Sequence, residues 1–422
     1  MRRENSLFRH RDFLHLWCAE SVSQLGSQVS LLALPLVAIT VLHATTFQVG
    51  ALTAVEMSPF VLVGLPAGAL VDRLPRRPVL VWCDIGRAVA LSSIPITYAF
   101  DALSYAQLLA VVFVTGTLTV FFDVAYQSIL PALVEREQIV DGNAKLEISR
   151  SGAQLAGPGL GGLLVQWIGA ASAITADAVS FVVSAIFLRG IRAQEPPIDV
   201  TVDEEVSRLR ALGREIREGL GYVLRHRVLR MIAGSTGTSN FFSSMTMAVF
   251  LLYAVRERHY SAGIVGLVFS VGNVGVLVAA LTAGRLTKKI RLGRAIWLGM
   301  FVSQLGPLVI ALAPTQHALP YFVGAWLGFG FGGTLYNIDQ VSLRQAITPQ
   351  RLQGRMNASM RFMVWGTMPF GSLAGGVLGT VIGLRSTLLV GGIGGLLAVL
   401  WLSARSVREL DEIPDAAPAA TT

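Results

Sequence analysis

Three carboxylates of the sequence, Glu20, Glu56 and Asp177, lie inside long apolar runs. A charged carboxylate in a membrane costs several kcal/mol unless it is paired or protonated, so such residues are candidates for proton binding. Glu56 lies about ten residues into its run, about 15 Å deep at 1.5 Å per residue, whereas Glu20 and Asp177 lie about two turns from the ends. We therefore expect Glu56 to be the main proton carrier. The alternative is a Glu56 held permanently by hydrogen bonds to a neighbouring helix.

Two polar stripes with helical spacing accompany these acids. Glu20, Ser23, Gln24, Ser27 and Gln28 follow the i, i+3, i+4, i+7, i+8 pattern, and Thr236, Ser239, Asn240, Ser243 and Ser244 repeat it. Such stripes favour two walls of one substrate cavity, although Ser and Asn also form hydrogen bonds between membrane helices. The cavity candidates are Gln24, Ser27, Gln28, Asn240, Ser243 and Ser244.

Several methionines and aromatic residues could provide an adaptable wall for lipophilic ligands. The alternative is plain packing or lipid contact, which is the commoner role of such residues in membrane helices. The candidates are Met57, Phe241, Met245, Trp326 and Trp365.

The composition indicates that the helices carrying these residues lie in a membrane. Hydrophobic residues make up 53% of the 422 residues, charged residues 14%, and the mean hydropathy is +0.60, whereas soluble domains carry about 25% charge. We predict an all-α membrane protein with twelve transmembrane helices in two six-helix halves. The expected spans are roughly 14–42, 46–71, 79–100, 105–128, 144–167, 171–189, 229–255, 262–284, 293–313, 318–343, 357–381 and 385–403.

The charge distribution orients these spans. Of 34 Lys and Arg residues, only Arg256, Arg258 and Arg385 fall on the outer side of this topology. The positive-inside rule therefore places both termini in the cytoplasm, as in a multi-pass protein of a bacterial inner membrane. This distribution also argues against nucleic acid as a partner.

Four segments are expected along the chain: an N-terminal half (1–189), a cytoplasmic linker (190–228), a C-terminal half (229–403) and a disordered, acidic tail (404–422). The linker has apolar residues at helical spacing beside arginines, which favours an amphipathic helix at the membrane surface. A solvated charged linker is the alternative. The apolar positions are Val206, Leu209, Leu212, Ile216, Leu220 and Val223.

The two halves repeat one another. A shift of 216 residues aligns Gly50 with Gly266 and Asp123 with Asp339, and a shift of 214 aligns Gly161 with Gly375. Duplicated six-helix halves are typical of secondary transporters, in which the substrate site lies between the halves.

A compact charge cluster, GALVDRLPRR, ends the second span at residues 68–77. It resembles the loop signature of the major facilitator superfamily, Gly-x-x-x-Asp-Arg-x-x-Arg-Arg, without a mismatch. The resemblance implies a conformational latch in which the aspartate lies near a helix N-terminus and the arginines pair with acids, which is consistent with helix-dipole and arginine chemistry. The implied latch residues are Gly68, Asp72, Arg73, Arg76 and Arg77, with Asp123 as the partner of Arg73 and Asp339 as its counterpart. Topogenic arginines alone are the alternative.

A second element, Gly157-Pro158-Gly-Leu-Gly161-Gly162, resembles the antiporter motif of that superfamily, although Ala153 replaces an expected glycine. The segments SQLGSQVSLLALPL, REGLGYVLRHRVLR and LPALVEREQIVDGNA resemble its enterobactin-exporter and macrolide-efflux (drug:proton antiporter) branch. This resemblance implies export of antibiotics or siderophore-like metabolites in exchange for protons. An importer or uniporter remains an alternative, as does a membrane sensor or scaffold that does not transport.

No enzyme, cofactor or metal site is expected. The sequence has no phosphate-binding loop, no His-Glu-x-x-His and no Gly-x-Ser-x-Gly. Its two cysteines, Cys18 and Cys83, are isolated and provide neither a disulfide framework nor a metal site. The expected partners are a small-molecule substrate, protons and membrane lipids, and we expect a monomer.

Overall fold

The structure is a computed structural model that describes residues 7–71, 73–135, 138–193, 217–408 and 410–411. Throughout these ranges the regular secondary structure is helical. Long apolar stretches form helices because only helices satisfy their own backbone hydrogen bonds inside a membrane.

The first six expected spans all form helices. They are α1 (Arg11–Leu36), α2 (Thr46–Leu62) with α3 (Gly64–Val71), α4 (Arg76–Ala99), α5 (Tyr105–Leu133), α6 (Ile139–Ile168) and α7 (Ala170–Arg189). The second span is broken after Leu62, shortly beyond Pro59, which lies inside α2. Proline interrupts helical hydrogen bonding, which accounts for a break at this place.

The last six spans are also helical. They are α9 (Arg227–Leu252), α10 (Ala262–Ile290), α11 (Leu292–Leu312), α12 (Leu319–Ile347), α13 (Gln353–Trp365) with α14 (Thr367–Val381), and α15 (Leu384–Leu402), followed by the short α16 (Arg405–Arg408). The eleventh span is broken at Gly366.

Eight of the described helical segments are individually long and apolar enough to cross a membrane: those containing α1, α4, α5, α7, α9, α10, α11 and α15. The other four expected spans are either broken in two, as in α2–α3 and α13–α14, or rich in glycine and polar residues, as in α6 and α12. The predicted all-α membrane fold is therefore confirmed.

The backbone repeats the internal duplication of the sequence. A π-helical turn follows α1 at Val37–Val41 and recurs after α9 at Tyr253–Glu257. The positive-φ residues His43 (49°) and Asp101 (52°) recur, 216 positions later, as His259 (54°) and His317 (62°). Gly169 (83°) recurs 214 positions later as Gly383 (86°). Both sequence shifts thus reappear as matching irregularities of the chain.

The chain forms two compact units. The N-terminal unit comprises residues 1–45, 55–200 and 259–270, and the C-terminal unit comprises residues 46–54, 201–258 and 271–422. Each unit thus contains a short segment from the other expected half (1–189 or 229–403): residues 259–270 belong to the N-terminal unit and residues 46–54 to the C-terminal unit. The sequence analysis did not predict this exchange. The exchanged segment 46–54 corresponds to residues 262–270 under the shift of 216, so the exchange itself follows the repeat.

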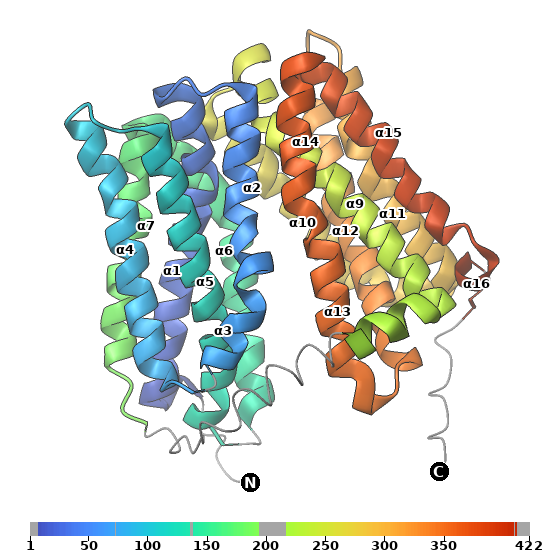
Figure 1. Cartoon of the computed structure of the whole chain (residues 1–422), viewed down its shortest axis with the longest axis horizontal. Helices are drawn as coiled ribbons and strands as arrows, with labels where there is room; N and C mark the ends of the chain where they lie inside the picture. Colours follow the sequence, from blue (N-terminus) through green and yellow to red (C-terminus); the bar gives the residue numbers. More distant parts are fainter. Residues whose placement is uncertain (1–6, 72, 136–137, 194–216, 409, 412–422) are drawn as a thin grey trace. The chain divides into compact units, whose positions relative to one another are not determined.

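Within the N-terminal unit, α1 packs against α6 and α7, and α4 packs against α5 and α7 (Figure 1). Its apolar core includes Leu16, Leu80, Ile129 and Leu188. In the C-terminal unit, α9 packs against α14 and α15, and α11 packs against α12 and α15. The core of that unit includes Ile232, Ile296, Met356 and Leu402.

The linker and the tail are described in part. Residues 217–225 are helical, and Val223 is fully buried in the core of the C-terminal unit, so this end of the expected amphipathic helix packs on protein. Leu220 is partly buried, and the other expected positions, Val206, Leu209, Leu212 and Ile216, lie outside the described residues. The tail was expected to be disordered from residue 404. In the structure, α16 buries Val407, and the backbone N–H of Leu292 donates a hydrogen bond of 3.2 Å to the Asp411 carbonyl oxygen. Residues 412–422 are not described.

Candidate functional site

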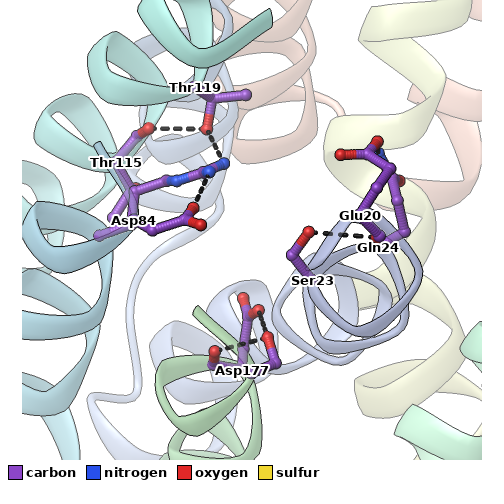
Figure 2. Close-up of polar contacts among 9 residues, drawn as sticks. Glu20, Ser23, Gln24, Asp84, Thr115, Thr119 and Asp177 are labelled. Carbon is purple, nitrogen blue, oxygen red and sulfur yellow. Dashed lines mark hydrogen bonds and ion pairs between the residues drawn. The ribbon is translucent and has the colours of Figure 1, made fainter. Parts of the chain in front are cut away.

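Polar side chains gather in the interior of the N-terminal unit, where α1, α4, α5 and α7 meet. Figure 2 shows Glu20, Ser23 and Gln24 on α1, Asp84 on α4, Thr115 and Thr119 on α5, and Asp177 on α7. Glu20 is 5% exposed, Asp177 is 2% exposed and Asp84 is fully buried. Acids buried this deeply in membrane spans require partners or protons.

Glu20 is held on one side only. The Gln24 side-chain amide donates a hydrogen bond of 2.7 Å to Oε1 of Glu20. Oε2 is also buried, and among the described residues no donor reaches it. The neighbouring Ser23 hydroxyl donates to the Glu20 carbonyl oxygen at 3.2 Å instead. The polar stripe of α1 therefore orients Glu20 but leaves one of its carboxylate oxygens without a partner.

Asp177 is held by its own helix and packed against α1. The Ser180 hydroxyl donates to Asp177 Oδ1 at 3.1 Å and to its carbonyl oxygen at 2.7 Å. A Cβ added to Gly26 of α1 would lie 2.6 Å from Asp177 Oδ1 and 2.1 Å from Ser180 Oγ. Only glycine therefore fits at residue 26.

Asp84 and Arg87 form a buried ion pair that the sequence analysis missed. Their side chains are 0% and 6% exposed. The Arg87 guanidinium lies between two rings, 4.3 Å from the centroid of Phe122 on α5 and 4.1 Å from that of Phe181 on α7. It also donates to Thr119 Oγ1 at 3.4 Å. This pair joins α4, α5 and α7.

The sequence did contain a signal for this pair. Opposite charges three residues apart lie on one face of a helix, and Asp84 and Arg87 lie inside the expected span 79–100. Because the charges offset each other, the pair is expensive to break and is suited to holding helices in place.

Glu56, the expected main proton carrier, lies on α2 and is partly buried. Among the described residues, none donates a hydrogen bond to its carboxylate or forms an ion pair with it. Its backbone carbonyl packs against Gly116 of α5, where a Cβ would lie 3.2 Å away. The alternative, a Glu56 held permanently by a neighbouring helix, has no support in these contacts.

A cavity of about 410 Å³ opens beside Glu20 within the N-terminal unit. Its lining also includes Tyr126 of α5 and a face of α6 that carries Asn143, Glu147 and Arg150. The other expected polar residues of α1, Ser27 and Gln28, are partly buried. Gln28 packs against α6, because its Cβ and Cγ would lie 2.5 Å from a Cβ added to Gly157.

The glycines of the antiporter-like motif are contact points between helices of the N-terminal unit. A Cβ on Gly161 would lie 3.0 Å from Cα of Val29 on α1. A Cβ on Gly162 would lie 2.5 Å from the carbonyl oxygen of Ala262, at the start of α10. The Pro158 carbonyl in turn lies 2.2 Å from a Cβ added to Gly266. Small residues allow the helix backbones to approach this closely.

The polar stripe of the C-terminal unit forms bonds between helices. Ser239 accepts a hydrogen bond of 2.7 Å from Gln304 on α11, and Asn240 donates one of 2.9 Å to the Val364 carbonyl on α13. Ser244 is buried, whereas Ser243 is partly exposed. These contacts favour the alternative given for this stripe in the sequence analysis, which is hydrogen bonding between helices rather than a cavity wall.

The residues of the expected lipophilic wall fall into two groups, some packed inside the protein and some accessible. Met245 is 3% exposed, and its carbonyl packs against Gly375, so it is placed for packing. Trp326 packs against Phe250 with ring centroids 5.2 Å apart. Phe241 and Met57 are partly exposed and Trp365 is 38% exposed, so these three remain accessible.

The expected latch residues have mixed surroundings. Asp72 lies outside the described residues. A Cβ on Gly68 would meet open space, so close packing does not account for this glycine. Arg77 donates to the carbonyls of Leu188 and Arg189 at the end of α7. Arg73, Arg76 and Asp123 each have contacts. In the C-terminal unit, the Thr287 hydroxyl near the end of α10 lies 3.0 and 2.9 Å from the two carboxylate oxygens of Asp339 and donates one shared hydrogen bond to them.

Comparisons with known proteins identify the family. The profile of the Major Facilitator Superfamily matches residues 16–366 and 235–420. The multidrug efflux pump Tap of Mycolicibacterium fortuitum is 28% identical over 84% of this chain and 86% of its own. The enterobactin exporter EntS of Citrobacter koseri is 26% identical over 97% of this chain and 96% of its own.

A solved structure shares the fold. It is that of a bacterial homologue of the iron transporter ferroportin in the inward-facing state, with a TM-score of 0.76 at 17% identity, covering 94% of this chain and all of that one. The duplicated helical units, the GALVDRLPRR loop and the profile match agree with one another. The chain is therefore a multi-pass membrane protein that belongs to the Major Facilitator Superfamily of transporters.

Proposed function

We propose that this transporter exports lipophilic small molecules, such as antibiotics or siderophore-like metabolites, in exchange for protons. The observation that carries the proposal is a group of membrane-embedded carboxylates, Glu20, Glu56 and Asp177, for which the described residues provide no ion-pair partner. Asp84, by contrast, is a buried acid of this unit that has Arg87 as its partner. A carboxylate without a counter-charge is stable in a membrane only while it is neutral or hydrated, which is the property of a proton carrier.

The direction of transport in this proposal comes from the relatives. Both Tap and EntS are exporters by name, and each matches most of this chain. At 28% and 26% identity, such relatives support a shared direction more strongly than a shared substrate. Antibiotics and siderophore-like metabolites are therefore the substrate classes with which testing begins.

The proposed cycle assigns a role to each group. Glu56 takes up a proton from the outer side and releases it to the cytoplasm, with Glu20 and Asp177 as further proton-binding positions. Substrate and proton compete, so proton uptake expels the substrate and proton release restores the substrate-binding form. The charge cluster at residues 68–77, with Asp123 and Asp339, acts as the latch that separates the two states.

Proton coupling can be tested in everted membrane vesicles. Respiration acidifies the vesicle lumen, and a transported compound then releases protons, which a pH-sensitive dye detects. The probes are ethidium, tetracycline, erythromycin and a catecholate siderophore. We expect at least one probe to release protons with the wild type, and Glu56→Gln to abolish the release. Asp101→Asn is the matched control, because Asp101 is an exposed loop acid whose positive φ suits Asn.

Other functions predict different results. An importer or uniporter would accumulate the probe in the cell, and a sensor or scaffold would move neither probe nor protons. A Glu56→Gln variant that still exports against a gradient with an unchanged pH dependence would remove Glu56 from its role. The proton carrier would then have to be sought in Glu20 or Asp177.

A further inference from the structure

The second half of the chain lacks one arginine of the GALVDRLPRR loop that forms a contact between helices in the first half. Under the shift of 216 residues, Arg77 corresponds to Gly293. In the N-terminal unit, the Arg77 guanidinium donates hydrogen bonds to the carbonyls of Leu188 and Arg189, so it ties the start of α4 to the end of α7. A glycine at residue 293 has no side chain with which to form the corresponding tie.

In the C-terminal unit, the end of the chain forms this tie instead. We define the C-terminal strap as α16 (Arg405–Arg408) together with Leu410 and Asp411, which follow α15. The backbone N–H groups of Leu292 and Gly293 donate hydrogen bonds of 3.2 and 2.9 Å to the carbonyls of Asp411 and Leu410. These N–H groups belong to the first turn of α11, where a helix provides no acceptors of its own. The strap therefore caps α11.

The packing at Gly293 admits only a backbone at this place. A Cβ added to Gly293 would lie 2.2 Å from the Val407 carbonyl oxygen and 2.7 Å from that of Arg408. Only glycine therefore lets the strap approach α11 this closely. The side chain of Val407 is fully buried in the core of the C-terminal unit, and Leu410 packs against that core. The strap is thus fitted to the start of α11 by both its backbone and its side chains.

An ion pair closes the strap at the protein surface. The Arg291 guanidinium lies 2.9 Å from Oδ1 of Asp411, and the two side chains are 59% and 62% exposed. Arg291 is the single residue between α10 and α11. Exposed pairs of this kind are weak and are screened by salt, so this part of the contact can open.

The charges of the neighbouring sequence are complementary. The chain from residue 409 to residue 415 is acidic, and the end of α10 and the start of α11 are basic. The acids are Glu409, Asp411, Glu412 and Asp415, and the bases are Arg285, Lys288, Lys289, Arg291 and Arg294. Opposite charges on two segments favour their association and make it depend on ionic strength.

We propose that the start of α11 is a docking surface for an acidic peptide segment, and that the C-terminal strap occupies this surface as a releasable clasp. The backbone hydrogen bonds and the buried Val407 hold the strap, and the Arg291–Asp411 pair sets how often it opens at a given ionic strength. Opening uncovers the first N–H groups of α11 and loosens the connection between α10 and α11. The strap is therefore a salt-sensitive control on this corner of the C-terminal unit, whatever the substrate or the direction of transport.

Hydrogen–deuterium exchange of the full-length protein in detergent micelles measures the opening of the strap. The reporters are the amides of Leu292 and Gly293, which are protected from exchange while the strap is docked. The rates are compared at about 0.01 M and about 1 M KCl, where the Debye lengths are about 30 and 3 Å. We expect the wild type to exchange about two- to fivefold faster at the higher salt concentration, which is the effect of losing an exposed ion pair.

Two variants open the strap from its two sides. Asp411→Asn should exchange about two- to fivefold faster than the wild type at the lower salt concentration and should show no further salt dependence. Gly293→Ala places a Cβ against the Val407 carbonyl, and it should raise the exchange rate of the Leu292 amide by about tenfold or more. If Gly293→Ala does not fold, the salt series with Asp411→Asn still decides, because the Asp411 side chain lies at the surface.

The matched controls change similar groups elsewhere. Asp141→Asn breaks an exposed ion pair of the N-terminal unit, and Gly284→Ala adds a Cβ that meets open space on α10. Neither should change the exchange of the two reporter amides. Equal exchange in the wild type and Asp411→Asn at the lower salt concentration would overturn the proposal. So would a salt dependence that persists in Asp411→Asn, or wild-type amides that exchange as fast as unprotected ones.

Discussion

The buried pair of Asp84 and Arg87 gives a sharp prediction about stability. Asp84→Asn leaves the Arg87 guanidinium without its ion-pair partner, and an arginine cannot lose its proton to become neutral. Both side chains are at most 6% exposed, so we expect a loss of about 3–5 kcal/mol in the free energy of unfolding. Arg87→Met leaves a carboxylate that can take up a proton, and it should cost less, about 1–3 kcal/mol.

The double variant Asp84→Asn/Arg87→Met decides between a pair and two independent residues. Removing both charges should bring stability to within about 1–2 kcal/mol of the wild type. The coupling energy of the double-mutant cycle should then be at least about 2 kcal/mol. The rings of Phe122 and Phe181 would pack against Met in place of the guanidinium, which lies 4.3 and 4.1 Å from them.

Unfolding in mixed micelles with increasing sodium dodecyl sulfate, followed by tryptophan fluorescence, measures these energies. The exposed pair Asp141–Lys145, in which Asp141 is 54% exposed, is the control, and Asp141→Asn should cost less than about 1 kcal/mol. Additive single-variant effects would refute the reasoning, as would an Asp84→Asn variant no less stable than Asp141→Asn.

Two further predictions concern other helices and loops. Gly26→Ala should lower the midpoint temperature of thermal unfolding, because its Cβ would lie 2.1 Å from Ser180 Oγ and overpacking costs about 1–3 kcal/mol. The control is Gly152→Ala on α6, whose Cβ meets open space, so this variant should leave the midpoint unchanged or raise it. Equal shifts in the two variants would contradict the close packing at Gly26. His226 caps α9 by accepting a hydrogen bond from the backbone N–H of Leu229, and burial lowers the pKa of His226 from its usual 6.5, so the neutral ring is favoured in the fold. That contribution is present above about pH 6.5 and is lost as the pH falls further towards the folded-state pKa. Wild type should therefore lose more stability than His226→Asn between about pH 7.5 and 5.5, and parallel pH profiles of the midpoint would contradict this.

The course of the helices was predictable from the sequence because each span is a long apolar run. The repeat was equally visible, and the matched positive-φ residues His43 and His259 show that it extends to the backbone. The breaks after Leu62 and at Gly366 were not predicted. Helix breaks depend on local backbone contacts that hydropathy does not record, although Pro59 gave a hint of the first.

The candidate site was only partly predictable for a similar reason. Glu20 and Asp177 stood out as isolated acids, whereas Asp84 and Arg87 were overlooked because their importance depends on Phe122 and Phe181, which belong to other helices. The polar stripe of residues 236–244 has the helical spacing of a cavity wall. Residues of this stripe nevertheless form hydrogen bonds to Gln304 and to the Val364 carbonyl on other helices. Spacing alone does not distinguish a cavity wall from hydrogen bonding between helices.

Accumulation of labelled macrolides, tetracyclines, lipophilic dyes and siderophores in cells that make this protein tests the central claim most directly. The measurement is made with and without a protonophore. Proton-driven export predicts lower accumulation of at least one compound, and the protonophore should restore it to the level of cells that lack the protein. Unchanged accumulation of every compound, or increased accumulation of any of them, would contradict export.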